Sequence, residues 1–171
     1  MFVDLFQNNQ MKELKIETVF KIYNNIHELN DDERHLMNRA TAALPEAYAP
    51  YSNFHVGAAI LLENGKIVTG TNQENASYPI GLCAERIALA AASSIHPDQK
   101  IKTIAVTIKN RNKPTLEPVS PCGTCRQVLL EKEQQSGSAI KILMKGEGEK
   151  VYELNSVSAL LPLSFGSKDL M

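Results

Sequence analysis

The sequence has few cysteines, no excess of either charge and no long apolar run, and each shortage argues against a class of protein. Its 171 residues include three cysteines, an odd number that a disulfide framework would not leave. The 18 basic residues nearly balance the 19 acidic ones, whereas a protein that wraps a nucleic-acid polymer is usually basic. No stretch approaches the roughly 18 apolar residues of a membrane span. A small-molecule ligand, with no nucleic-acid polymer and no membrane, is therefore the first expectation.

The N-terminal residues carry no recognisable targeting signal. Residues 1–10 lack the basic and apolar regions of a signal peptide, so we expect a cytoplasmic protein whose thiols stay reduced. The composition, 43% hydrophobic and 22% charged, is that of an ordinary globular protein. We expect one domain over residues 1–171, in which residues 1–12 form a loose extension and residues 13–29 an added segment containing a strand.

Hydrophobic periodicity and turn residues divide the chain into strands and helices. Asn30 followed by Glu33 is a capping-box pattern, and the helix after it should end or bend near Pro45. Asn64-Gly65 indicates a tight turn between two strands. The helix that starts at Cys83 is apolar on nearly every side, which is typical of a buried helix. The expected strands cover residues 13–23, 54–62, 66–71, 101–108, 140–144 and 150–154, and helices begin near residues 30, 83, 122 and 156. This order predicts an α/β fold with a mixed sheet and helices packed on its faces.

All three cysteines lie at the starts of two consecutive helices that are separated by one strand. Two neighbouring βα units would bring those helix starts together, so Cys83 should lie close to Cys122 and Cys125. The last two are three residues apart, so their thiols project from adjacent turns and can hold one ion. Three ligands leave one coordination position free, which is typical of a catalytic zinc site.

The alternative is a closed structural zinc site, which would need a fourth ligand. The chain has no fourth cysteine. Its histidines are isolated from one another and have no ligand spacing to the cysteines: His27, His35, His55 and His96.

Glu85 is the candidate catalytic residue, since it follows Cys83 by two positions. On a helix its carboxylate would point into the same cavity as the free zinc position. There it could take a proton from water and deliver it to a substrate nitrogen. The alternative is an acid in the first helical turn that complements the helix dipole. A Cys-x-Glu followed by Pro-Cys-x-x-Cys corresponds to the zinc-deaminase signature.

Five segments, in this order, resemble the small zinc-dependent cytidine deaminases. They are residues 51–59 (YSNFHVGAA), 72–79 (NQENASYP), 81–86 (GLCAER), 120–127 (SPCGTCRQ) and 160–166 (LLPLSFG). The resemblance covers about residues 30–170, so residues 30–171 would be the family core. It implies a three-layer α/β/α fold with a mixed five-stranded sheet. It also implies one Zn²⁺ per subunit and a homotetramer with sites at subunit contacts. The implied reaction is hydrolysis of cytidine or 2′-deoxycytidine in pyrimidine salvage.

The resemblance also implies a role for each matching residue. Cys83, Cys122 and Cys125 would hold zinc and Glu85 would shuttle protons. Phe54 would pack on the base, Asn72 and Glu74 would bind the ribose hydroxyls, backbone at Ala84 would touch the pyrimidine, and Phe165 would reach a neighbouring subunit's site. Some of these residues have simpler alternatives: core packing for Phe54, turn capping for Asn72 and Glu74, and tail packing for Phe165.

The negative charge of the three zinc ligands should be compensated by a nearby group. Zn²⁺ with three thiolates is formally −1, so a nearby cation should compensate. Arg86 and Arg126 adjoin the motif residues, and the family pattern favours hydrogen bonds from Arg86 to the thiolates. An ordinary salt bridge is the alternative for both.

Three rival functions stay open at the level of sequence. A blasticidin-S type deaminase shares the zinc motifs but lacks the segment at residues 72–79, which favours a nucleoside here. A polynucleotide-editing deaminase would need a basic, aromatic-lined groove, and the charge balance argues against it. A non-catalytic, zinc-stabilised binding module is the third.

Overall fold

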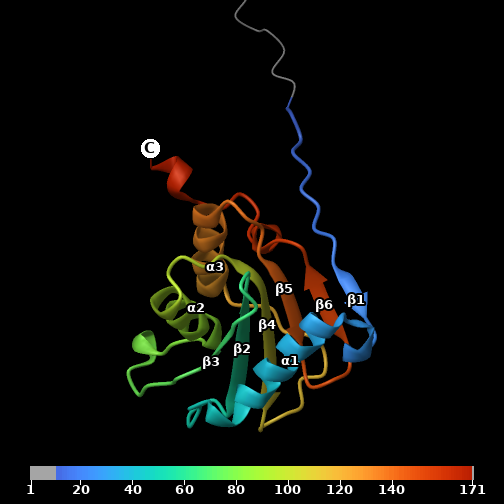
Figure 1. Cartoon of the computed structure of the whole chain (residues 1–171), viewed down its shortest axis with the longest axis vertical. Coiled ribbons are helices and arrows are strands. Elements are labelled where there is room, and N and C mark those ends of the chain that lie inside the picture. The colour runs from blue at the N-terminus through green and yellow to red at the C-terminus, as the bar shows by residue number, and fades with distance from the viewer. Residues whose placement is uncertain (1–10, 171) are drawn as a thin grey trace, which may run out of the picture.

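The protein forms one six-stranded mixed sheet with helices on both faces, as the computed structural model in Figure 1 shows for residues 11–170. The strand order is β1-β6-β5-β4-β2-β3, and only β4 and β5 are parallel neighbours. The strands are β1 (Lys21–Tyr23), β2 (Phe54–Leu62), β3 (Ile67–Thr71), β4 (Ile101–Asn110), β5 (Lys141–Lys145) and β6 (Val151–Leu154). The helices are α1 (Asp31–Ala43), α2 (Ala84–Ile95) and α3 (Gly123–Ser136), with 3₁₀ turns η1 (Ile26–Glu28), η2 (Leu44–Glu46), η3 (Tyr78–Ile80), η4 (Val157–Leu160) and η5 (Ser167–Asp169).

Each face of the sheet has its own hydrophobic core. On one face α1 packs its buried residues Leu36, Met37 and Ala40 against β2, β4 and β5. On the other face α2 and α3 cover a larger cluster that includes Ile60, Ile104 and Ile142. The predicted three-layer α/β/α fold is therefore confirmed. The predicted count of five strands is wrong by one, because β1 adds a sixth strand beside β6.

The β1 strand is much shorter than the predicted strand at residues 13–23. It pairs with β6 through three residues only, from Lys21 opposite Glu153 to Tyr23 opposite Val151. Its length is limited because β6 ends at Leu154 and the chain then turns into η4, which leaves residues 11–20 without a neighbouring strand. The expected loose segment at residues 1–12 falls almost entirely outside the described residues.

One predicted local signal, the tight turn, forms as expected, and another, the capping box, forms only in part. Gly65 adopts the left-handed φ of 80° that the turn between β2 and β3 requires. Asn30 caps α1 by accepting a hydrogen bond from the backbone N–H of Glu33 at 2.9 Å. The capping box is incomplete, however, because the Glu33 carboxylate bonds Lys141 Nζ at 2.6 Å instead of returning to Asn30.

The α2 helix is not buried on all sides in the single chain. Ala84, Ala88 and Ala92 face the sheet and are buried, whereas Ala90 and Ile95 are exposed. The expectation of a fully buried helix is thus wrong for this chain alone, because only one side of α2 meets the sheet. Among residues 11–170, no helix is long and apolar enough to cross a membrane.

Glycines let α1 and α2 approach the two faces of the sheet closely. A Cβ atom at Gly57 would clash with the carbonyl of Ala40 on α1. A Cβ atom at Gly70 would lie 2.5 Å from the carbonyl oxygen of Ala84 on α2, and would also clash with the backbone nitrogen of Ala88. Backbone therefore rests directly on backbone at both positions, which fixes the depth at which each helix lies.

A buried carboxylate ties β1 to the sheet. Glu153 on β6 is 1% exposed, and its oxygens accept hydrogen bonds from Lys21 Nζ and Tyr23 Oη, both at 2.8 Å. Lys141 Nζ lies 3.6 Å away. Desolvation alone would raise the pKa of Glu153, but these partners outweigh it and hold the pKa below its ordinary value. Two of the three partners come from β1, so β1 satisfies a charge that would otherwise be buried with too few partners.

Replacing Tyr23 with phenylalanine should lower the free energy of unfolding by about 2 kcal/mol, because one bond to a buried carboxylate is lost. Urea denaturation at neutral pH measures this. Glu153 has a lowered pKa when folded, so its contribution is present above its unfolded pKa and is lost as the pH falls through the folded value. The loss should therefore shrink in acid. Tyr152→Phe is the matched control, since its hydroxyl bonds the exposed Glu117 at 3.2 Å, and equal losses in the two variants would contradict the prediction.

Candidate functional site

The sheet topology explains why two helix starts meet. Both β3 and β4 run antiparallel to β2, so they are parallel to each other, and α2 leads from one to the other. In the same way α3 connects β4 to its parallel neighbour β5. Helices that follow parallel strands on one face begin at the same end of the sheet. The first turns of α2 and α3 therefore lie side by side, as the sequence predicts.

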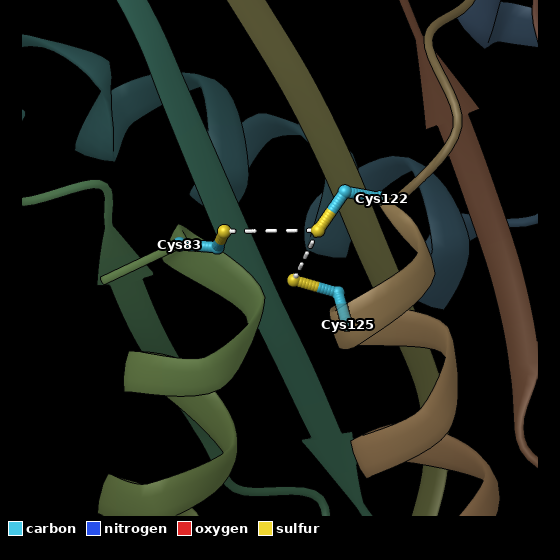
Figure 2. A group of neighbouring side chains, drawn as sticks. All are labelled: Cys83, Cys122 and Cys125. Carbon is cyan, nitrogen blue, oxygen red and sulfur yellow. Dashed lines mark hydrogen bonds between the residues drawn. The ribbon is translucent and has the colours of Figure 1, made fainter. Parts of the chain in front are cut away.

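The three cysteines converge at this end of the sheet. Cys83 and Cys122 are the N-cap residues of α2 and α3, and neither uses its side chain as a cap. Cys125 lies in the first turn of α3 and is buried. Figure 2 shows the three sulfur atoms turned toward one another from the two helices.

The sulfur positions fit a zinc ion. Cys122 Sγ lies 3.9 Å from Cys83 Sγ and 3.5 Å from Cys125 Sγ, and all three sulfurs lie within 4.8 Å of one another. Tetrahedral zinc with Zn–S bonds of about 2.3 Å requires S···S separations of about 3.8 Å. The cluster contains no fourth ligand within the described residues, so a bound ion would keep one position for water or substrate. The prediction that Cys83 lies close to Cys122 and Cys125 is confirmed.

The cluster stabilises one of its thiols in the charged form that a metal needs. A hydrogen bond from the Cys125 thiol lowers the pKa of Cys83 to about 6, and the charge of Arg86 acts in the same direction. The same hydrogen bond raises the pKa of Cys125. Zinc binding must displace the protons that the thiols hold.

Glu85 lies in the first turn of α2, next to the thiols. Its side chain is 4% exposed and lines a cavity of about 680 Å³. Burial raises the pKa of its carboxyl group. A carboxyl group with a raised pKa beside a water-activating centre is suited to carrying a proton between water and a substrate.

The cavity is large enough for a nucleoside-sized ligand. Cys83, Glu85 and Cys122 line it together with residues of β2, of β4 and of the segment that follows β3. The lining residues include Tyr51, Ser52, Phe54, Val56, Asn72, Glu74, Asn75, Tyr78, Leu82, Ile108, Val119 and Ser120. One cavity thus contains Cys83 and Cys122 together with the three side chains that the sequence resemblance assigns to substrate binding, Phe54, Asn72 and Glu74.

Asn72 is fixed by the backbone of β2. Its Oδ1 accepts from Val56 N–H at 2.7 Å, and its Nδ2 donates to the Phe54 carbonyl at 2.8 Å. These bonds hold the start of β2, and hence the Phe54 ring, against the end of β3. A second Nδ2 hydrogen and a second Oδ1 lone pair are left for a ligand.

Glu74 is fixed by the loop before β2. Its carboxylate accepts from the backbone N–H groups of Tyr51 and Ser52, at 2.9 and 3.2 Å, and from the Ser52 hydroxyl. Desolvation opposes ionisation, but these bonds outweigh it and lower the pKa of Glu74. The carboxylate is therefore an ionised acceptor on the cavity wall. Ser52 was not among the predicted site residues, although it lies within the matching segment at residues 51–59.

Four of the predicted residues do not line the cavity: Cys125, which is buried, and Ala84, Phe165 and Arg86. Ala84 is buried at the start of α2, where its backbone N–H has no helical partner. Phe165 is 59% exposed, and its carbonyl accepts from Gln127 Nε2 at 3.0 Å on the outside of α3. Arg86 is half-buried, and within residues 11–170 its side chain forms no hydrogen bond to a thiol.

Arg126 has a role that the sequence did not indicate. Its guanidinium donates to the Pro121 and Leu160 carbonyls at 2.7 and 3.0 Å, and to the Ser120 hydroxyl at 2.8 Å. It therefore fixes the turn that presents Cys122 and connects this turn to η4. The expected alternative of a salt bridge is not what forms, because the guanidinium is occupied by carbonyl and hydroxyl oxygens.

Replacing Arg86 with glutamine should speed zinc release into a competing chelator about ten-fold, because a positive charge beside the thiolates is lost. Arg86→Lys keeps the charge and is the control. Zinc content and turnover that both match the native protein would refute the compensating role.

Comparison with known proteins finds relatives of one kind. The model of the cytidine and deoxycytidylate deaminase zinc-binding region matches residues 30–136. The chain is 37% identical to the cytidine deaminase of Halalkalibacterium halodurans over 139 residues, 81% of this chain and 98% of that protein. It is 38% identical to the cytidine deaminase of Mycobacterium tuberculosis over 135 residues, 79% of this chain and 90% of that protein.

Solved structures show the same similarity. The 1.6 Å crystal structure of cytidine deaminase from Burkholderia pseudomallei aligns with a TM-score of 0.67 at 39% identity, covering 77% of this chain and 97% of that one. The crystal structure of the Mycobacterium tuberculosis cytidine deaminase aligns with a TM-score of 0.61 at 35% identity, covering 80% and 99%.

Proposed function

The chain belongs to the cytidine and deoxycytidylate deaminase family, and from that premise we propose that it hydrolyses cytidine and 2′-deoxycytidine to uridine and 2′-deoxyuridine. Ammonia is the second product, and pyrimidine salvage is the role that such an activity serves. The observation that carries the proposal is the cluster of three sulfurs within 4.8 Å of one another, beside buried Glu85 in one cavity.

Cys83, Cys122 and Cys125 would hold one Zn²⁺ per subunit. When bound, zinc supplies Lewis-acid activation of a water molecule for attack on an electrophilic carbon. The remaining chemistry falls to the chain's own groups. The start of α2 and the start of α3 orient the thiolates, and the positive charge of Arg86 offsets part of theirs.

Glu85 would move the protons of the reaction. As water adds to C4 of the cytosine ring, its carboxylate accepts a proton and delivers it to N3. It then takes a second proton from the new C4 hydroxyl and passes it to the amino group, which leaves as ammonia. The sum is one water consumed and one ammonia released. Its buried position beside the thiols supports this assignment.

The cavity walls would hold the nucleoside. Phe54 offers an aromatic ring to the base, and the backbone N–H of Ala84 offers a donor to the pyrimidine edge. Asn72 and Glu74 offer an amide and an ionised carboxylate, which suit the hydroxyl groups of a ribose. Both are held rigidly by bonds to the backbone of β2 and the loop before it, so they are pre-organised for the sugar.

Phe165 would act in the site of a neighbouring subunit, and a homotetramer is the assembly that we propose. Two observations support this. Phe165 is 59% exposed and does not line the cavity of its own chain, and one side of α2 carries apolar residues to the surface.

Phe165→Ala should raise KM about ten-fold through loss of an aromatic contact, while the assembly stays intact. Leu170→Ala, at another exposed site in the tail, is the control. Steady-state kinetics and light scattering are the measurements, and an unchanged KM would count against a role in substrate binding.

We also propose that the protein is cytoplasmic. Three thiols can hold zinc only if they stay reduced, which the cytoplasm ensures.

The direct test is to mix the zinc-loaded protein with cytidine or 2′-deoxycytidine and follow the ultraviolet change and the ammonia released. Conversion of at least one nucleoside at more than trace rates supports the proposal. Zinc binding without conversion of either nucleoside would favour a zinc-stabilised binding module instead.

A further inference from the structure

The residues before β1 form an extended arm whose apolar side chains have little to pack against. This N-terminal arm comprises residues 11–20, and it leaves the body of the protein beside β6, as Figure 1 shows. It lies outside the segment that matches the family, which begins at residue 30. Two interactions join the inner end of the arm to the body: a hydrogen bond from Thr18 Oγ1 to the Ala159 carbonyl at 2.9 Å, and a tilted ring pair of Phe20 and Tyr152 with centroids 6.0 Å apart.

The arm has the side-chain pattern of a strand that lacks a neighbour. Side chains two residues apart share one face of an extended chain. The even positions of the arm are apolar apart from Lys12 and Thr18, and Leu14, Ile16 and Phe20 are 74%, 47% and 39% exposed. Beyond the arm, the outer edge of β1 has no partner strand within residues 11–170. An exposed apolar row continuous with an unpaired sheet edge is suited to strand addition.

The opposite face of the arm carries charges that alternate in sign. Glu13, Lys15 and Glu17 follow one another at odd positions, and Lys15 already pairs with Glu17 in the same chain. In an antiparallel pair of identical strands, residues whose numbers add to a constant lie opposite each other. An alternating row can then place neighbouring charges of opposite sign opposite each other, so the arm is complementary to a second copy of itself.

We propose that the N-terminal arms of two copies of this chain pair antiparallel about a two-fold axis at Ile16. In this register Lys15 of each copy faces Glu17 of the other, and Leu14 faces Thr18. The apolar rows of both arms then lie on one face, which is the face that packs on the body at Thr18 and Phe20.

Four other two-fold registers that keep the apolar rows on one face are less favourable. A centre at Lys15 would place Glu13 opposite Glu17, and a centre at Glu17 would place two glutamates opposite each other. A centre at Thr18 would place Lys15 opposite Lys21. A centre at Leu14 pairs Glu13 with Lys15 but places Phe20 opposite a position outside the arm. The centre at Ile16 pairs opposite charges and uses the whole arm.

Disulfide trapping tests the register directly. In Ile16→Cys, the two new thiols would face each other across the axis, within the distance that a disulfide spans. In the control Leu14→Cys, they would lie about 13 Å apart along the strand, which a disulfide cannot bridge. Both zinc-loaded variants are exposed to oxidised glutathione, with the native chain as background for the zinc-site cysteines.

The expected result is that most Ile16→Cys chains run at twice the mass of one chain on a non-reducing gel, whereas Leu14→Cys chains do not. Trapping of Leu14→Cys alone would overturn the register. Equal trapping of both, or of neither above the native background, would overturn the pairing.

Charge reversal provides an independent test. Lys15→Glu, built into Ile16→Cys, places like charges opposite each other at two symmetric positions. It should reduce trapping about ten-fold, as expected for two reversed cross-strand pairs. Adding Glu17→Lys restores opposite charges and should restore trapping. Failure of the charge exchange to restore it would contradict the proposal. Neither readout depends on catalysis, so the outcome is independent of the proposed deamination.

Discussion

Glu85→Gln should lose nearly all turnover, at least about 10³-fold in kcat, while it retains zinc. Glutamine has the same shape and can still form hydrogen bonds, but it cannot accept and release a proton. Because Glu85 is not one of the three clustered thiols, the zinc site should remain intact. Zinc analysis of the purified variant together with steady-state kinetics on cytidine measures both effects.

The control for this variant is Glu131→Gln, which makes the same chemical change at an exposed position of α3. It should match the native rate. A Glu85→Gln protein that keeps more than about a tenth of the native kcat would show that another group carries the protons. A variant that loses zinc as well as rate would instead assign Glu85 a part in holding the metal.

Cys125→Ser should lose zinc and activity together. Cys125 is the buried member of the cluster, with its sulfur 3.5 Å from Cys122 Sγ. Serine nearly preserves the volume but does not supply a thiolate, so the affinity for zinc should fall by at least about 100-fold. The cluster joins α2 to α3, so the loss should also lower the midpoint of thermal unfolding, because zinc binds the folded chain and not the unfolded one.

Metal removal from the native protein is the control for this second variant. A chelator should abolish the native activity, and added Zn²⁺ should restore it, whereas Zn²⁺ should not restore Cys125→Ser. The two variants then separate the roles at the site, since one is inactive with zinc and the other is inactive for lack of it. A Cys125→Ser protein with full zinc content would contradict the three-thiolate assignment.

The zinc cluster was predictable from sequence because its geometry follows from local rules. The spacing of Cys122 and Cys125 fixes their relation within one helical turn, and a βα repeat brings Cys83 beside them. The helix at residue 31 and the hairpin at Gly65 were predictable for the same reason. Each depends on a few neighbouring residues, Asn30 as a cap and Gly65 as the residue with positive φ.

What the sequence missed depends on partners that lie far apart in the chain. The extent of β1 is set by the length of β6, more than 120 residues later, rather than by the hydrophobic pattern of residues 13–23. The Glu33 carboxylate does not complete the capping box because it accepts a hydrogen bond from Lys141 on β5. The guanidinium of Arg126 bonds Leu160 across the fold, which no spacing along the sequence indicates.

The close contact at Gly70 helps to position the active site, although this residue lies outside the cavity. Gly70 does not line the cavity, yet α2 lies directly on it through Ala84 and Ala88. Any side chain at this position would act as a wedge that lifts α2 from the sheet, and Cys83 and Glu85 would move with the helix while α3 stays in place. Displacements of about 1 Å can cost a reaction about two orders of magnitude. A substitution at Gly70 would therefore lower the catalytic rate before it destabilised the fold. Selection for catalysis thus extends to a residue that does not contact the substrate.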